Sequence, residues 1–169
     1  MATPPRSRTR PRSAPPARPP AARGATITVR PARGADLGAV VALDARATGL
    51  EKRAYWRGVF RRYGGAAEGR QFLVAETGSR VVGFIIGEVR DWEFGSPPCG
   101  WVFGIDVHPD ARQAGVGSRL LDAISAGFRR AGVRTIRTML ARDNALVLSF
   151  FRSQGMMAGP FIPLEKVLE

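Results

Sequence analysis

The residues best suited to chemistry in this chain form the run Arg112-Gln113-Ala114-Gly115-Val116-Gly117, which leads into an expected helix. The first turn of a helix leaves backbone N–H groups without partners, and the helix dipole favours an anion beside them. Glycine has no Cβ, so a phosphate can approach those groups closely. Arg112 and Arg119 add positive charge nearby. The run therefore predicts a binding site for a pyrophosphate.

Two familiar phosphate-binding loops do not fit these residues. A Walker A loop needs Gly-Lys followed by Ser or Thr, and no Gly-Lys pair occurs in the sequence. A dinucleotide-binding fingerprint needs a third glycine at the place where this chain has Leu120. Two glycines at a helix start are common, so the interpretation of the run depends on the elements around it.

The elements on both sides of the run are the clearest in the sequence. Trp101–Val107 is a mainly apolar strand of the kind found near the middle of a sheet, and Pro109 ends it. Gly115–Ala131 is an amphipathic helix, closed by Gly132. The run is thus expected between a central strand and a packed helix.

The rest of the body alternates between strands and helices. Further strands are expected at Thr26–Arg30, Gln71–Glu76, Val81–Asp91, Arg134–Ala141 and Phe161–Leu168. Further helices are expected at Asp36–Thr48, at Leu50–Tyr63 and from Asp143 or Asn144 to Gln154. Thr77-Gly78-Ser79 predicts a tight turn that joins two of the strands as a hairpin. This order predicts an α/β layer sandwich on a mixed sheet.

The glycine run and its surroundings resemble those of the GNAT N-acetyltransferase superfamily. The run matches the family motif Q/R-x-x-G-x-G/A, and Val107-His108-Pro109 matches the end of the strand before it. The later family pattern is matched by Asn144, Phe150, Phe151, Gly155 and Met156. The resemblance covers about residues 26–168. It implies an α/β/α layer sandwich on a central mixed, mostly antiparallel sheet of six to seven strands.

The resemblance implies that acetyl-CoA is the acyl donor. No Cys/His cluster with metal-ligand spacing occurs in the sequence, so no metal is expected. Backbone N–H groups from Gln113 to Ser118 would hold the pyrophosphate, and the Ile105–Val107 edge would pair with the pantetheine amides. The Val107 N–H would donate to the oxyanion. The residues expected to contact the donor are Ile105, Val107, Arg112, Gln113, Ala114, Gly115, Val116, Gly117, Ser118, Arg119, Asn144 and Phe151.

Both proton-handling residues that are usual in the family are replaced here. Phe151 stands where many members have a general-acid tyrosine, and Trp101 stands where some have a general-base glutamate. Glu88 is the first candidate for a substitute base and Asp106 is the second, although pairing of Glu88 with an arginine, or a structural role for Asp106, fits the sequence as well. Transfer by proximity alone, or through a water relay, is also open.

The expected acceptor is a primary amine on a protein N-terminus, a lysine or a small metabolite. Acidic residues near the expected entrance, namely Glu88, Asp91 and Glu93, favour a cationic amine. Trp56, Tyr55, Tyr63 and Trp92 form a weaker hypothesis for an acceptor groove, because aromatic residues at helical spacing are more often core. Two other functions remain open: a non-catalytic acyl-CoA-binding module, and a nucleic-acid-associated protein.

The nucleic-acid hypothesis rests on the charge, which is +12 for the whole chain. Six arginines fall in residues 1–24, so residues 25–169 carry 20 basic against 14 acidic side chains, or +6. We interpret 1–24 as a disordered Arg/Pro-rich tail and 25–169 as one N-acetyltransferase domain, and we do not expect nucleic acid as a partner. The single cysteine and the lack of a long apolar run favour a cytoplasmic protein without membrane contact. The late strand Phe161–Leu168 is a candidate homodimer interface by resemblance.

Overall fold

The computed structural model describes residues 26–65 and 68–168, so the predicted tail over 1–24 lies outside the described residues. The helices and strands in chain order are β1 (Ile27–Pro31), α1 (Leu37–Thr48), α2 (Arg53–Tyr63), β2 (Arg70–Thr77), β3 (Arg80–Arg90), β4 (Cys99–Val107), α3 (Val116–Arg130), β5 (Ile136–Thr138) and α4 (Ala145–Ser153). Within these residues no helix is long and apolar enough to cross a membrane.

The sheet has five strands in the order β1-β2-β3-β4-β5. Strands β1 to β4 are antiparallel neighbours, and β5 pairs with β4 in parallel. The expected hairpin turn is confirmed, because Thr77 pairs with Arg80 and Gly78 takes a φ of 61°. A left-handed φ of this kind suits glycine in a two-residue turn.

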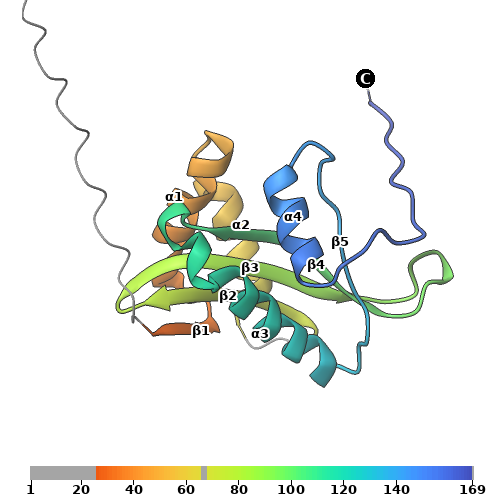
Figure 1. Cartoon of the computed structure of the whole chain (residues 1–169), viewed down its shortest axis with the longest axis horizontal. Coiled ribbons are helices and arrows are strands. Elements are labelled where there is room, and N and C mark those ends of the chain that lie inside the picture. The colour runs from red at the N-terminus through yellow and green to blue at the C-terminus, as the bar shows by residue number, and fades with distance from the viewer. Residues whose placement is uncertain (1–25, 66–67, 169) are drawn as a thin grey trace, which may run out of the picture.

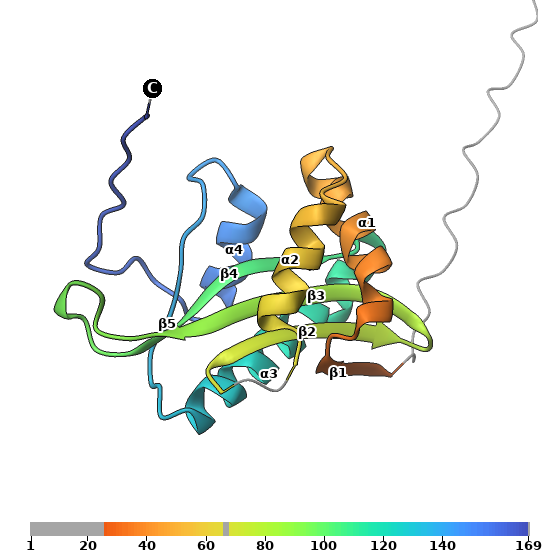
Figure 2. The same ribbon diagram turned by 180° about the vertical axis from the view of Figure 1, so that it is seen from behind.

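Helices cover both faces of the sheet, so the predicted fold class is confirmed. Figure 2 shows α1 and α2 in front of the sheet, and Figure 1 shows α3 and α4 against the opposite face. Each face has its own buried cluster: Trp56, Phe72 and Phe84 belong to the first, whereas Leu120 and Phe128 belong to the second.

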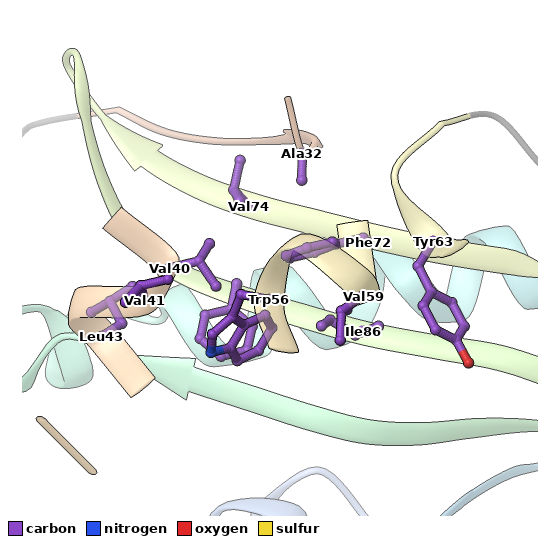
Figure 3. Packing of buried hydrophobic residues seen from close by; sticks show 11 residues of the cluster. Ala32, Val40, Val41, Leu43, Trp56, Val59, Tyr63, Phe72, Val74 and Ile86 are labelled. Carbon is purple, nitrogen blue, oxygen red and sulfur yellow. The ribbon is translucent and has the colours of Figure 1, made fainter. Parts of the chain in front are cut away.

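The buried face of α2 follows helical spacing. Trp56, Val59 and Tyr63 are buried, and they lie three and four positions apart (Figure 3). The Trp56 ring meets the Phe84 ring edge to face, with 5.1 Å between centroids. Tyr55, the neighbour of Trp56 in the sequence, is 53% exposed instead. Tyr55 and Trp56 therefore have different surroundings although they are adjacent.

The number of strands was predicted wrongly. The expected strand Phe161–Leu168 does not form, and the expected strand Arg134–Ala141 shrinks to the three residues of β5. Pro160 and Pro163 lack the N–H that a strand interior donates, which opposes pairing of the late segment. This segment leaves Ile162 and Leu164 exposed. The described sheet therefore has five strands rather than six to seven.

Candidate functional site

Strand β4 has an open edge over its second half. Strand β5 pairs with β4 only at Gly100–Val102, so Phe103–Val107 lies beside β3 alone. The His108 N–H donates to the Val82 carbonyl at 2.8 Å. Because such bonds alternate along an antiparallel pair, Ile105 and Val107 direct their N–H and C=O groups to the open edge. The part of β4 that was expected to pair with the pantetheine amides therefore has an edge with no neighbouring strand among the described residues.

A β-bulge interrupts β4 just before this edge. Ile86 pairs with Gly104 and Gly87 pairs with Val102, which leaves Phe103 without an opposite residue. The Phe103 ring packs against the Tyr63 ring at 5.1 Å between centroids. A bulge bends its strand and redirects a side chain. This one places Phe103 beside the open edge.

The glycine run connects β4 to α3 as predicted. Pro109–Ala114 forms a short 3-10 turn, and Gly115 follows it with a φ of 76°. That conformation favours glycine because a Cβ would be strained there. A Cβ on Gly117 would lie 2.9 Å from the Phe150 ring, so glycine allows the first turn of α3 to pack against α4. Glycine is thus favoured at 115 by the backbone conformation and at 117 by the close packing of Phe150.

One cleft of about 870 Å³ surrounds the open edge. Its lining from α1, α2 and the segment between them comprises Asp44, Ala47, Thr48, Lys52, Tyr55 and Trp56. Its lining from β3 and β4 comprises Phe84, Ile86, Phe103, Gly104, Ile105, Asp106 and Val107. The lining from the glycine run and α4 comprises Arg112, Gln113, Gly115, Gly117, Ser118, Asn144, Leu146, Val147, Phe150, Ser153 and Gln154.

Four of the residues expected to contact the donor are not part of this cleft lining. Ala114 is outside the cleft lining, Val116 is fully buried, and Arg119 directs its guanidinium to the Ile27 carbonyl at 3.5 Å. Phe151 is 3% exposed and belongs to the core, whereas its neighbour Phe150 lines the cleft. The expected aromatic contact therefore moves from Phe151 to Phe150, because the inward face of α4 turns Phe151 toward the sheet.

The family follows from a comparison of sequences. A model of the acetyltransferase (GNAT) family matches residues 39–156, which contain the glycine run, the open edge and α4. This chain belongs to the GNAT family. It is an acyltransferase by that membership. No curated protein matches the sequence.

Solved structures share the GNAT fold at low sequence identity. The aminoglycoside N-acetyltransferase AAC(6')-Iy in complex with CoA is 19% identical with a TM-score of 0.75, over 86% of this chain and 97% of that chain. A transcriptional regulator from Bacillus halodurans C-125 is 20% identical with a TM-score of 0.71, over 85% and 100%. The 6'-N-acetyltransferase AAC(6')-Ih from Acinetobacter baumannii is 17% identical with a TM-score of 0.71, over 85% and 100%. These likenesses establish the fold.

Asp106 lines the cleft near the end of β4. Its Oδ1 accepts from the Val107 N–H at 2.7 Å and lies 3.7 Å from Arg112 Nη2. Arg112 Nε also donates to the Val107 carbonyl at 3.0 Å. Burial raises the pKa of Asp106, although the Val107 N–H and Arg112 act in the opposite direction. The expected oxyanion donor is therefore bonded to a carboxylate whose pKa is raised above the ordinary aspartate value.

Glu88, the other candidate carboxylate, lies outside the cleft lining. Its Oε2 accepts from the Tyr63 hydroxyl at 3.0 Å, and its Oε1 lies 3.3 Å from Arg90 Nε. Asp91 and Glu93, which were expected near the entrance, lie outside the lining as well. The structure thus has the arginine-paired arrangement that the sequence left open for Glu88.

Asp44 is a cleft residue that sequence reasoning missed. It is 8% exposed, and its Oδ2 accepts from Trp56 Nε1 at 2.9 Å and lies 3.0 Å from Lys52 Nζ. The available signal was an acidic residue on the apolar face of α1, next to Leu43. Of the aromatic residues in the groove hypothesis, Tyr55 and Trp56 line the cleft.

His108 and Cys99 are both buried, and each has an arginine as a side-chain partner. Arg80 Nη2 lies 2.9 Å from His108 Nε2, and burial together with Arg80 lowers the pKa of this imidazole. Cys99 is buried, with Arg137 Nη1 at 3.6 Å from its sulfur. Among the residues that the structure describes, no three His, Cys, Asp or Glu side chains gather where they could hold a metal ion.

Proposed function

We propose that this GNAT domain transfers an acetyl group from acetyl-CoA to a primary amine. The observation that carries the proposal is the continuity of one cleft from the glycine run, along the open edge of β4, to the α1–α2 side. The N–H groups after Gly115 suit the pyrophosphate. The Ile105 N–H and C=O suit the pantetheine amides in the manner of an added strand. The thioester would then lie near Asp106 and Val107.

In the proposed reaction the amine nitrogen attacks the thioester carbonyl, and the carbon–sulfur bond breaks to release CoA thiolate. The Val107 N–H is the proposed donor to the oxyanion. Asp106 is the proposed base, and its raised pKa suits that role. A protonated Asp106 is also a weaker acceptor, so taking the proton would free the Val107 N–H for the oxyanion. Asn144 would contact the pantetheine or its cysteamine end.

The test begins with calorimetric titration of acetyl-CoA into the full chain, followed by thiol release over a panel of primary amines. Micromolar binding with amine-dependent thiol release supports the proposal. Binding without release from any amine would favour an acyl-CoA-binding module instead. Absence of binding would contradict the assignment of the glycine run.

A matched pair of glycine variants locates the donor site. Gly117→Ala places a Cβ 2.9 Å from the Phe150 ring and should weaken acetyl-CoA binding about tenfold or more. Gly38→Ala is the control, because a Cβ there meets nothing within 4 Å. Thermal unfolding of both variants distinguishes lost binding from lost fold. Equal affinities for both variants would place the pyrophosphate elsewhere.

A further inference from the structure

Asp44 is a carboxylate inside the cleft for which the proposed chemistry has no use. It lies on α1 and is 8% exposed, although it lines the cleft. A buried carboxylate is stable only when it is paired or hydrogen-bonded. Trp56 Nε1 donates to Oδ2 at 2.9 Å, which fixes the direction of the carboxylate. The remaining partner decides what the site recognises.

That partner is a primary ammonium group supplied by the chain itself. Lys52 Nζ lies 3.0 Å from Asp44 Oδ2, and its side chain is 36% exposed. A lysine is a flexible point charge, so it can leave the carboxylate without disturbing the backbone. Asp36 offers a contrast, because Arg30 holds both of its oxygens through a fixed guanidinium fork at 2.7 and 2.9 Å. Asp44 is thus paired with a replaceable cation.

The walls around Asp44 also suit an ammonium group. Lys52 Nζ lies 5.6 Å from the centroid of the Tyr55 ring, and Tyr55 meets Trp56 edge to face at 5.3 Å. Aromatic faces attract cations, and the attraction grows when water is excluded. A carboxylate and two aromatic rings therefore meet around one place in the cleft, and that place already holds a primary ammonium.

A single amino group cannot both occupy this place and react. The attacking amine has to be neutral, whereas an ammonium group on Asp44 is held in its charged form. Asp106 and Asp44 line the same cleft, and the charge of Asp44 contributes to the raised pKa of Asp106. The cleft thus has one carboxylate beside the proposed thioester position and another on its α1 wall. Two amino groups on one acceptor match the two carboxylates.

We infer that Asp44 binds a second, non-reacting ammonium group of the acceptor, so that the acceptor is a diamine or polyamine. Lys52 occupies this place until the acceptor displaces it. The inference rests on the proposed function for the reacting amino group, but the binding of the second group is separable from the chemistry.

The test compares α,ω-diamines with monoamines of the same chain length at saturating acetyl-CoA. The wild type should prefer the best diamine by about tenfold or more in kcat/KM, mainly through KM. Asp44→Asn keeps an acceptor oxygen for Trp56 Nε1 but removes the charge, so it should lower kcat/KM for the diamine much more than for the monoamine of the same length and abolish most of this preference. Equal use of both amine classes by the wild type, or an unchanged preference in Asp44→Asn, overturns the inference.

Lys52 provides an independent arm. Lys52→Met removes the internal occupant and should lower KM for the diamine several-fold, with little change in kcat. Lys166→Met is the matched control, because Lys166 is the only other lysine in the chain and lies exposed in the late segment. A KM for the diamine that is unaffected by Lys52→Met would contradict the displacement of Lys52.

Calorimetric titration of the diamine into the protein–CoA complex separates this inference from the proposed function. Binding by the wild type and loss of binding in Asp44→Asn support the ammonium site even where no amine is acetylated, and the proposed function then fails alone. Acetylation of monoamines and diamines without distinction overturns the ammonium site alone. If the diamine does not bind and no amine is acetylated, both the ammonium site and the proposed function are overturned.

Discussion

Asp36 ties the end of β1 to the turn before α1. Its carboxylate accepts from both terminal nitrogens of Arg30 at 2.7 and 2.9 Å and from the Arg33 N–H at 2.7 Å. Hydrogen bonding by Arg30 holds the pKa of Asp36 below its usual range, despite burial. The same carboxylate raises the pKa of Arg30, so the pair is charged throughout the neutral range. Its role is structural.

Asp36→Asn should therefore lower the free energy of unfolding by about 2 kcal/mol at neutral pH. A lowered folded pKa means that the stabilisation is present above the unfolded value of 3.8 and is lost as the pH falls through the folded pKa. Urea unfolding of wild type and variant should consequently converge in acid. Asp122→Asn, on the exposed face of α3, is the control and should stay within about 0.5 kcal/mol. A pH-independent difference would contradict the assignment.

The pKa of Asp106 is shifted in the opposite direction from that of Asp36. Because burial raises its pKa in the folded state, the folded chain holds its proton to higher pH than the unfolded chain does, and its ionisation at neutral pH costs stability. Asp106→Asn should raise the melting temperature at neutral pH, and the gain should fade as the pH drops through the folded pKa. The same variant should lower kcat. A variant that is both less stable and fully active would exclude Asp106 as the base.

The residues of the site differ in how readily the sequence reveals them. The run around Gly115 was predictable because its chemistry is local, consisting of consecutive N–H groups at a helix start. Asp44 was not predictable, because its place in the cleft depends on contacts with Trp56 and Lys52, which follow α1 in the sequence. The sequence does not distinguish Phe150 from Phe151, since a shift of one residue decides which of them is buried and which lines the cleft.

At the scale of elements, α3 packs so closely on the sheet that two strands need glycine beneath it. A Cβ on Gly100 of β4 would collide with the Phe128 ring, and one on Gly87 of β3 would lie 2.9 Å from Phe128 Cζ. Phe128 is 1% exposed, so the ring has no room to move aside. The ring of one helix residue thus covers a pair of glycines on adjacent strands.

Gly100→Ala should destabilise the fold by about 1–3 kcal/mol, because the added methyl group overpacks a closed core. The measurement is thermal or urea unfolding, and Gly38→Ala on the exposed face of α1 serves again as the comparison. Gly100→Ala combined with Phe128→Leu should recover part of the loss if the collision is its cause. An unchanged melting temperature for Gly100→Ala would mean that α3 moves freely over β4.

The elements themselves were predictable to different degrees. The apolar residues of α3 recur with the 3.6-residue period of a helix, so its own sequence predicts it. The turn at Gly78 is likewise predicted by three consecutive residues. The end of β5 after Thr138 is not, because a strand exists only where it pairs with a neighbour, and β5 pairs with β4 only at Gly100–Val102. The bulge at Phe103 is equally invisible, since it is a property of two strands in register.

At the scale of the whole molecule, charge is concentrated at one end of the sequence. Deleting residues 2–24 halves the net charge from +12 to +6. We expect acetyl-CoA affinity to be unchanged, since the lining residues of the cleft in the described part of the chain fall between Asp44 and Gln154. Affinity for nucleic acid should be weak in both forms at physiological salt. A loss of tight, steeply salt-dependent nucleic-acid binding on deletion would show that the arginines contact phosphates.

The open edge of β4 also bears on the order in which the molecule comes apart. Strands β1 to β4 form an antiparallel meander of sequence neighbours, whereas β5 joins it through three residue pairs. Amide hydrogens of α4 should consequently exchange with solvent before those of β2 and β3. A donor lying between the glycine run and α4 would bind only the molecules in which α4 is folded against the sheet. It would therefore slow the exchange of the α4 amide hydrogens. Bound acetyl-CoA would then act as the missing neighbour of β4, and the loaded protein would resist proteolysis better than the empty one.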